Sequence, residues 1–160
     1  MSESVYLGNP NLKKANVQQQ WTKKQVEEFS LCMKDPIYFI QNYIKIVSLD
    51  EGLVPFDLYD FQKEMVGTFH SNRFTICKLP RQSGKSTTII SYLLHYVLFN
   101  DSVNVAILAN KAATARDLLG RLQLAYEHLP KWLQQGVMSW NKGSLELENG
   151  SKILASSTSA

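Results

Sequence analysis

The sequence predicts an α/β fold in which helices flank a parallel sheet and a small helical region comes first. From residue 73 onward, short apolar segments that suit strands alternate with longer segments of helical periodicity. This alternation is typical of right-handed βαβ units, which build parallel sheets. Before residue 73, helix-start signals recur. We therefore expect an N-terminal arm and helical subdomain over residues 1–55 and an α/β region over residues 56–160.

The first two helices are indicated by the residues that start them. The T-x-x-Q pattern at Thr22 has the spacing of a capping box and opens a helix to about Met33. Asp35-Pro36 begins a second helix through Ile44, because proline suits the first helical position.

Three further segments complete the N-terminal part. A third helix is expected over residues 59–69. Residues 1–20 contain glycine, proline, asparagine and glutamine without periodicity, so we expect a mobile arm there. Residues 48–57 are expected to form a loop.

The α/β region begins with a strand, a helix and a second strand. Residues 73–79 are a strand candidate, and residues 86–99 form a helix that is apolar on nearly every side. Residues 103–109 read VNVAILA, as expected of a strand covered on both faces. The segment between residues 79 and 86 therefore joins a strand to a buried helix.

A helix and a hairpin follow. Asn110 can cap a helix whose apolar residues share one stripe. The stripe comprises Ala115, Leu118, Leu119, Leu122, Tyr126 and Leu129. Residues 144–156 are expected to form a β-hairpin about Asn149-Gly150, a dipeptide that favours a two-residue type I′ turn.

The segment that joins the first strand to the first helix of this region reads LPRQSGKST, residues 79–87. A loop in this position aims backbone N–H groups and the positive end of the helix dipole at one point, where a phosphate is favoured. It departs from the phosphate-loop pattern G-x-x-x-x-G-K-[ST] at Leu79, which stands at the first glycine. A plain strand-to-helix turn is the alternative. The buried helix and the basic surroundings favour the phosphate loop.

The loop and the helix that follows it predict a nucleotide site. Gly84 allows a phosphate to come close, Lys85 supplies charge for the β- and γ-phosphates, and the Ser86 hydroxyl can ligate magnesium. The expected cofactors are therefore ATP and magnesium. The expected nucleotide-binding residues are Gln62, Pro80, Arg81, Gln82, Ser83, Gly84, Lys85, Ser86 and Thr87.

Arg81 and Lys85 are the catalytic candidates. No acidic residue occurs between Glu64 and Asp101, whereas four basic residues do, so the local field suits a polyanion or a nucleotide phosphate. The Arg81 guanidinium has two interpretations. It is either an arginine finger supplied in cis, which reaches the γ-phosphate, or a structural or DNA-facing arginine.

Gln62 lies in an aromatic segment, FDLYDFQKEM, upstream of the loop. A glutamine amide can pair with the N6/N7 edge of adenine, and an aromatic neighbour can stack on the ring. A glutamine on a helix is usually just solvated. Its position before a phosphate loop favours adenine recognition.

Composition excludes several classes of site. The chain has 160 residues and two cysteines, which are too few and too isolated for a metal site or a disulfide framework. The N-terminus lacks the apolar core of a signal peptide, and no apolar stretch reaches 18 residues. We therefore expect no membrane span and a cytoplasmic protein.

Four stretches together resemble one family: LYDFQKEM, CKLPRQSGKST, ILANKAATARDLLGRLQLAYEHLP and WNKGSLELENGSKILASS. They are similar to the large terminase subunit of T-even-like contractile-tailed bacteriophages, most of all its cyanophage branch. The resemblance covers residues 56–160, and the N-terminal helical part more loosely. It implies a RecA- or helicase-like phosphate-loop NTPase fold, with adenine contact for Gln62, the loop arginine at Arg81, the phosphate lysine at Lys85 and the magnesium hydroxyl at Ser86.

The same resemblance implies a function and a set of partners. The family is an ATPase motor that packages double-stranded viral DNA into a procapsid in the host cytoplasm. Its implied partners are the DNA, the portal protein and the small terminase subunit, and its implied assembly is a ring on the portal. The family also carries an endonuclease domain.

Part of the family pattern has no counterpart in this chain. The family's Walker B strand consists of four apolar residues followed by Asp-Glu, and neither Asp101 nor Asp117 lies in such a context. We therefore expect an incomplete ATPase domain, an N-terminal fragment of a longer motor that is inactive alone. A split-gene subunit is the alternative.

Two other functions compete with the packaging motor. A superfamily 2 helicase also places a glutamine motif before its phosphate loop, but the Arg81-containing loop and the WNKGSLELENGSKI hairpin favour the terminase. A non-catalytic nucleotide-binding or assembly module, in which ATP merely orders the fold, is the third possibility.

Overall fold

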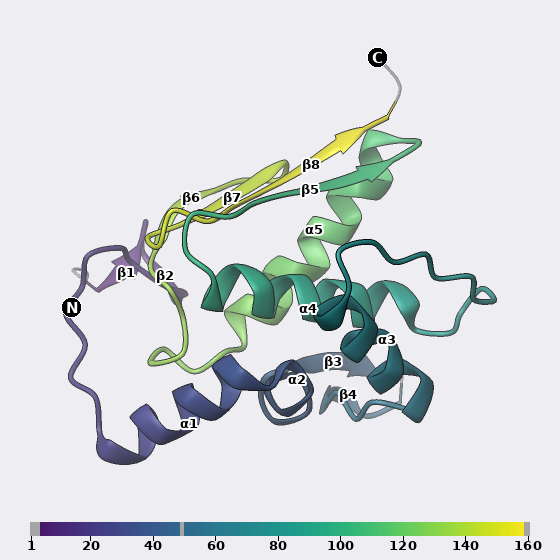
Figure 1. Cartoon of the computed structure of the whole chain (residues 1–160). Coiled ribbons are helices and arrows are strands. Elements are labelled where there is room, and N and C mark those ends of the chain that lie inside the picture. The colour runs from purple at the N-terminus through teal and green to yellow at the C-terminus, as the bar shows by residue number, and fades with distance from the viewer. Residues whose placement is uncertain (1–3, 49, 159–160) are drawn as a thin grey trace.

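A computed structural model describes residues 4–48 and 50–158 and has a mixed α/β architecture (Figure 1). The helices are α1 Lys23–Lys34, α2 Pro36–Tyr43, α3 Asp60–Ser71, α4 Lys85–Phe99 and α5 Ala112–Glu127. The strands are β1 Val5–Tyr6, β2 Asn9–Lys13, β3 Lys45–Ser48, β4 Gly52–Pro55, β5 Asn104–Ala109, β6 Val137–Trp140, β7 Ser144–Leu147 and β8 Lys152–Ser157. No helix among the described residues is long and apolar enough to cross a membrane.

The main sheet has the strand order β5-β8-β7-β6. Only β5 and β8 run parallel, in register from Asn104 opposite Lys152 to Ala109 opposite Ser157. The pairs β7-β8 and β6-β7 are antiparallel. The expectation of a parallel sheet is therefore correct for one pair only. The other pairs are antiparallel because a short hairpin turn, rather than a helical crossover, joins β7 to β8.

Helices cover one face of this sheet. Helix α5 packs on β5 and β8, and α4 packs on α5, with α2 and α3 on the far side of α4 (Figure 1). On the other face, the side chains of Leu108 and Leu154 are 59% and 54% exposed. The expectation that residues 103–109 are covered on both faces is therefore wrong. Their apolar composition fits a strand, but no described element lies over the outer face.

Residues 73–79 are extended but are not part of a sheet, so the strand expected there is wrong. Alternate side chains point inward, whereas Phe74 and Ile76 are 82% and 97% exposed. The buried Thr75 hydroxyl has no hydrogen-bond partner among the described residues. The segment has strand periodicity but pairs with no described strand, and β5 remains the edge strand of the main sheet.

The three expected N-terminal helices are confirmed as α1, α2 and α3, with the capping box of Thr22 and Gln25 and the proline of α2 in place. The mobile arm expected over residues 1–20 is wrong for residues 5–13, where β1 and β2 form a hairpin, and residues 1–3 lie outside the described residues. Leu12 is buried in the core, and the Lys13 backbone N–H donates to the Gln134 amide oxygen (3.0 Å). Contacts with residues far away in sequence hold this segment in place, and the local hydrophobic pattern gives no sign of them.

The loop expected over residues 48–57 is also wrong. Strands β3 and β4 form an antiparallel hairpin, with Ile46 opposite Val54 and Ser48 opposite Gly52. Gly52 has a φ of +74°, which a turn of this kind requires and which glycine adopts without strain. Each strand has only four residues. Turn residues therefore dominate the composition of the segment, and the sequence reads as a loop.

The C-terminal elements follow the expectations with two corrections. Helix α5 begins after Lys111, so Asn110 is not its N-cap. The hairpin of β7 and β8 is confirmed, but the type I′ turn is wrong, because Gly150 has a positive φ and Asn149 does not. Type I′ requires a positive φ at both central residues. The Asn149 side chain instead donates to the Val97 carbonyl (2.9 Å) and ties the turn to α4.

His95 of α4 lies in the aromatic core beside Phe39 and Phe99, with ring centroids 5.5 and 4.8 Å away. Its Nε2 donates to the Cys32 carbonyl (2.8 Å), while the buried Nδ1 has no partner among the described residues. The pKa of this imidazole is lowered to about 4, mainly by burial and to a smaller degree by the nearby His70. The core therefore holds His95 in its neutral form.

This pKa predicts that the protein loses stability as the pH falls from about 6.5 toward 4. In that window the unfolded chain binds a proton at His95 and the folded chain does not, which costs up to roughly 3 kcal/mol. Urea unfolding at several pH values measures the slope. His95→Gln should flatten the slope relative to the parent. Equal slopes in the parent and His95→Gln would contradict a depressed pKa.

Candidate functional site

The loop between the extended segment and α4 has an unusual backbone. Gln82 and Gly84 have φ angles of 60° and 72°, whereas Arg81 before them and Ser83 between them do not have positive values. An alternation of this kind turns successive N–H groups toward one side and forms a concavity that favours anions. The Ser83 hydroxyl donates to the Pro80 carbonyl (3.0 Å) and closes the loop on itself.

The N-terminus of α4 opens directly into this loop. Its N-cap is Gly84, and no side chain caps the helix there. The N–H groups of the first turn therefore point out of the helix without a side-chain acceptor. A helix of 15 residues also carries the positive end of its dipole at this point. The arrangement favours an anion at the start of α4.

Three polar side chains surround this point. The Lys85 ammonium donates to the Pro80 carbonyl (2.9 Å), so it lies over the loop. Ser86 is half-buried in the first turn of α4, and Arg81 is exposed at the tip of the loop. The described ion pairs involve none of these residues. Positive charge is therefore concentrated beside the helix start.

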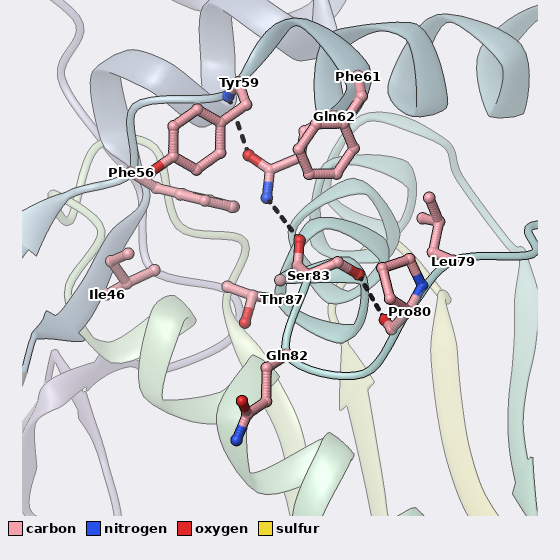
Figure 2. A pocket seen from close by; sticks show the side chains of 11 residues that line it. Ile46, Phe56, Tyr59, Phe61, Gln62, Leu79, Pro80, Gln82, Ser83 and Thr87 are labelled. Carbon is pink, nitrogen blue, oxygen red and sulfur yellow. Dashed lines mark hydrogen bonds between the residues drawn. The ribbon is translucent and has the colours of Figure 1, made fainter.

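Gln62 joins this loop to α3. Its side chain is 2% exposed, its amide oxygen accepts from the Tyr59 backbone N–H (3.0 Å), and its Nε2 donates to the Ser83 carbonyl (3.4 Å) (Figure 2). The first bond completes the N-terminus of α3, and the second fixes the loop. The solvated glutamine considered as an alternative is therefore wrong, because this amide is buried and bonded at both ends.

A cavity of about 560 Å³ lies between the loop and an aromatic wall (Figure 2). The rings of Tyr59 and Phe61 stack at 6.0 Å with an interplanar angle of 10°. The lining residues are Ile46, Phe56, Tyr59, Phe61, Gln62, Leu79, Pro80, Gln82, Ser83, Gly84 and Thr87. This volume and this mixture of apolar walls with a few polar groups are typical of small-molecule sites.

The structure brings together most of the residues that the sequence singled out. Gln62, Pro80, Gln82, Ser83, Gly84 and Thr87 line the cavity. Arg81, Lys85 and Ser86 belong to the same loop and helix start but are outside that lining. Ile46 was missed, because residues 45–48 were not expected to be a strand. The β-branched pair Ile46-Val47 was the available signal for one.

Acidic groups are absent from this lining, which contains neither aspartate nor glutamate. Among the described residues there is also no cluster of three or more histidine, cysteine or acidic side chains that could hold a metal ion. A metal ion that is carried in by phosphates, rather than held by the protein alone, could take the Ser86 hydroxyl at the start of α4 as a ligand. The lining residues therefore offer no carboxylate that could serve as a general base.

A protein-family model described as "Terminase large subunit, T4likevirus-type, N-terminal" matches residues 76–160. The matched region contains the loop, α4 and the main sheet.

The loop geometry predicts the effect of a methyl group at Gly84. A Cβ there would lie 2.7 Å from the Gln62 Nε2, and the positive φ strains any L-residue. Gly84→Ala should therefore destabilise the protein by about 1–2 kcal/mol. Gly67→Ala is the matched control in α3, where nothing lies within 4 Å, and it should stabilise by about 0.5–1 kcal/mol. Thermal unfolding measures both, and equal stability of the two variants would contradict the loop conformation.

Proposed function

The chain belongs to the family of T4-like large terminase subunits, to whose N-terminal region it corresponds, and on that premise we propose that the loop and cavity form its ATP site. The observation that carries the proposal is the bond from the Gln62 amide to the Ser83 carbonyl. It joins an aromatic cavity, which suits a purine, to a loop that suits phosphates. A nucleotide is the ligand that has both parts.

The phosphates would bind at the start of α4. The N–H groups of the loop and of the first helical turn can donate to phosphate oxygens, and Lys85 is close enough to turn from the Pro80 carbonyl toward them. Thr87 follows Ser86 and lines the cavity, so in this proposal it would lie where the phosphates meet the nucleoside. Bound with magnesium, the triphosphate would place the metal at the Ser86 hydroxyl.

The base would occupy the cavity. Gln62 has one amide hydrogen and one oxygen lone pair left after its two backbone bonds, enough for the N6/N7 edge of adenine. Phe56, Tyr59 and Phe61 offer apolar surface for the ring. We propose Arg81 as the arginine that faces the γ-phosphate, because its exposed side chain is free to turn toward the loop.

ATP hydrolysis needs more than these residues supply. Phosphoryl transfer requires a carboxylate that helps to hold magnesium and a group that orients the attacking water. The cavity lining contains no carboxylate. We therefore propose that these residues bind and position ATP, and that the water-orienting group of the packaging ATPase comes from elsewhere.

The family also suggests the larger setting. We propose that the site serves packaging of double-stranded viral DNA in the host cytoplasm, with the portal protein and the small terminase subunit as partners and a ring as the assembly. The site supports the energy-supplying role in this setting, because an ATP site is what a packaging motor requires. The helicase alternative has no comparable support in the family match.

Two variants of the same loop test the site. Lys85→Ala should weaken ATP binding severely, because the ammonium nearest the phosphates is lost. Arg81→Ala removes a cation from the exposed tip and should leave the Kd of ATP within about threefold, since its proposed role begins only at hydrolysis. Displacement of a fluorescent ATP analogue measures both, and phosphate release should stay at background throughout. Undiminished binding by Lys85→Ala would place the nucleotide elsewhere.

Gln62→Ala tests the base contact separately from the loop contact. Losing the bond to Ser83 should weaken ATP, GTP and tripolyphosphate alike, whereas losing the adenine contact should weaken ATP further, so that the preference for ATP over GTP disappears. Competition binding with the three ligands gives the comparison. A preserved ATP preference would reduce Gln62 to a purely structural residue.

A further inference from the structure

Ile46 lies where two hollows of the surface meet. It lines the cavity described above, and it also lines a second one of about 320 Å³ between β3, α4 and α5. Thr87 is the other residue that both share. In Figure 2, Ile46 and Phe56 lie on the side of the cavity away from Pro80 and Leu79. The β3–β4 hairpin therefore forms a wall that faces the loop.

The root of this hairpin is fixed in the core. The Phe56 N–H donates to the Ile44 carbonyl (2.9 Å), and both side chains are buried. The Gln41 amide donates to the Asp57 carboxylate (2.9 Å), which ties the end of the hairpin to α2. The wall is thus present before any ligand binds, so a ligand does not have to order it.

Strand alternation selects Ile46 within the hairpin. Ile46 is half-buried, whereas Val47 and Leu53, which pair with each other one position further along, are exposed. Successive side chains of a strand point to opposite faces. Ile46 therefore presents its apolar side chain to the cavity, and Leu53 presents an equally apolar one to solvent.

We infer that the β3–β4 hairpin is the nucleobase wall of the ATP site, and that the purine packs against Ile46 while its edge meets Gln62. This inference rests on the proposed ATP site. It adds a face contact from an aliphatic side chain to the edge contact from the glutamine amide. A flat purine gains from such packing because apolar surface leaves water on both partners. The triphosphate does not touch this wall.

The test uses the full chain with Ile46→Ala and Ile46→Val, and Leu53→Ala as the matched control on the same hairpin. Displacement of a ribose-labelled fluorescent ATP analogue gives the Kd of unlabelled ATP and of tripolyphosphate, which has no base. We expect Ile46→Ala to raise the Kd of ATP about three- to tenfold and Ile46→Val by less. Tripolyphosphate should bind all variants equally, and Leu53→Ala should match the parent.

Two results would overturn the inference and leave the ATP site intact. In both, Lys85→Ala weakens ATP binding. In the first, the Ile46 variants bind ATP as Leu53→Ala does. In the second, the Ile46 variants bind ATP and tripolyphosphate more weakly by the same factor. The second pattern would mean that Ile46 supports the loop rather than the base. If Lys85→Ala binds ATP like the parent, the proposed site itself fails, and the inference fails with it. Far-UV circular dichroism confirms folding of each variant, and Ile46→Val keeps the test valid if Ile46→Ala does not fold.

Discussion

The site depends on one buried amide. Gln62 accepts a hydrogen bond from the start of α3 and donates one to the loop before α4, so a single side chain sets the distance between the aromatic wall and the loop. Because the amide is buried, the loss of either hydrogen bond would lower the stability of the fold by about 1–3 kcal/mol. Gly84 follows from the same constraint, because the Nε2 of Gln62 occupies the space that a Cβ would need. Gln62 and Gly84, which both line the cavity, are therefore in close contact.

Much of the fold could be predicted from local signals. The capping box at Thr22, the proline that starts α2 and the apolar stripe of α5 each report a helix through residues that are close in sequence. The segments that were mispredicted depend on distant partners. The β1–β2 hairpin is held by a hydrogen bond to Gln134, which lies far away in sequence. Residues 73–79 have the alternation of a strand, but no described strand pairs with them. The hydrophobic alternation of a segment indicates that it can form a strand, but not whether another strand lies beside it.

The candidate site was predictable for similar reasons. The residues of the proposed phosphate loop are contiguous, so their spacing could be matched to a pattern, and Gln62 was found through its aromatic neighbours. The structure brings Gln62 to Ser83 across an interval of 21 residues. Ile46 could not be found in this way, because it reaches the cavity through a hairpin whose existence depends on the packing of Phe56 and Ile44. Sequence motifs therefore identify the charged and polar groups of the site, but they do not identify the apolar side chains that shape its cavity.

The contact between Lys85 and the Pro80 carbonyl determines where the charge of this side chain lies before any ligand binds. An ammonium group has three N–H donors, and this bond uses one of them, so two donors remain for an anion. The loop therefore holds its own lysine in place beside the start of α4, and part of the entropy cost of ordering that long side chain is met by the fold rather than by binding.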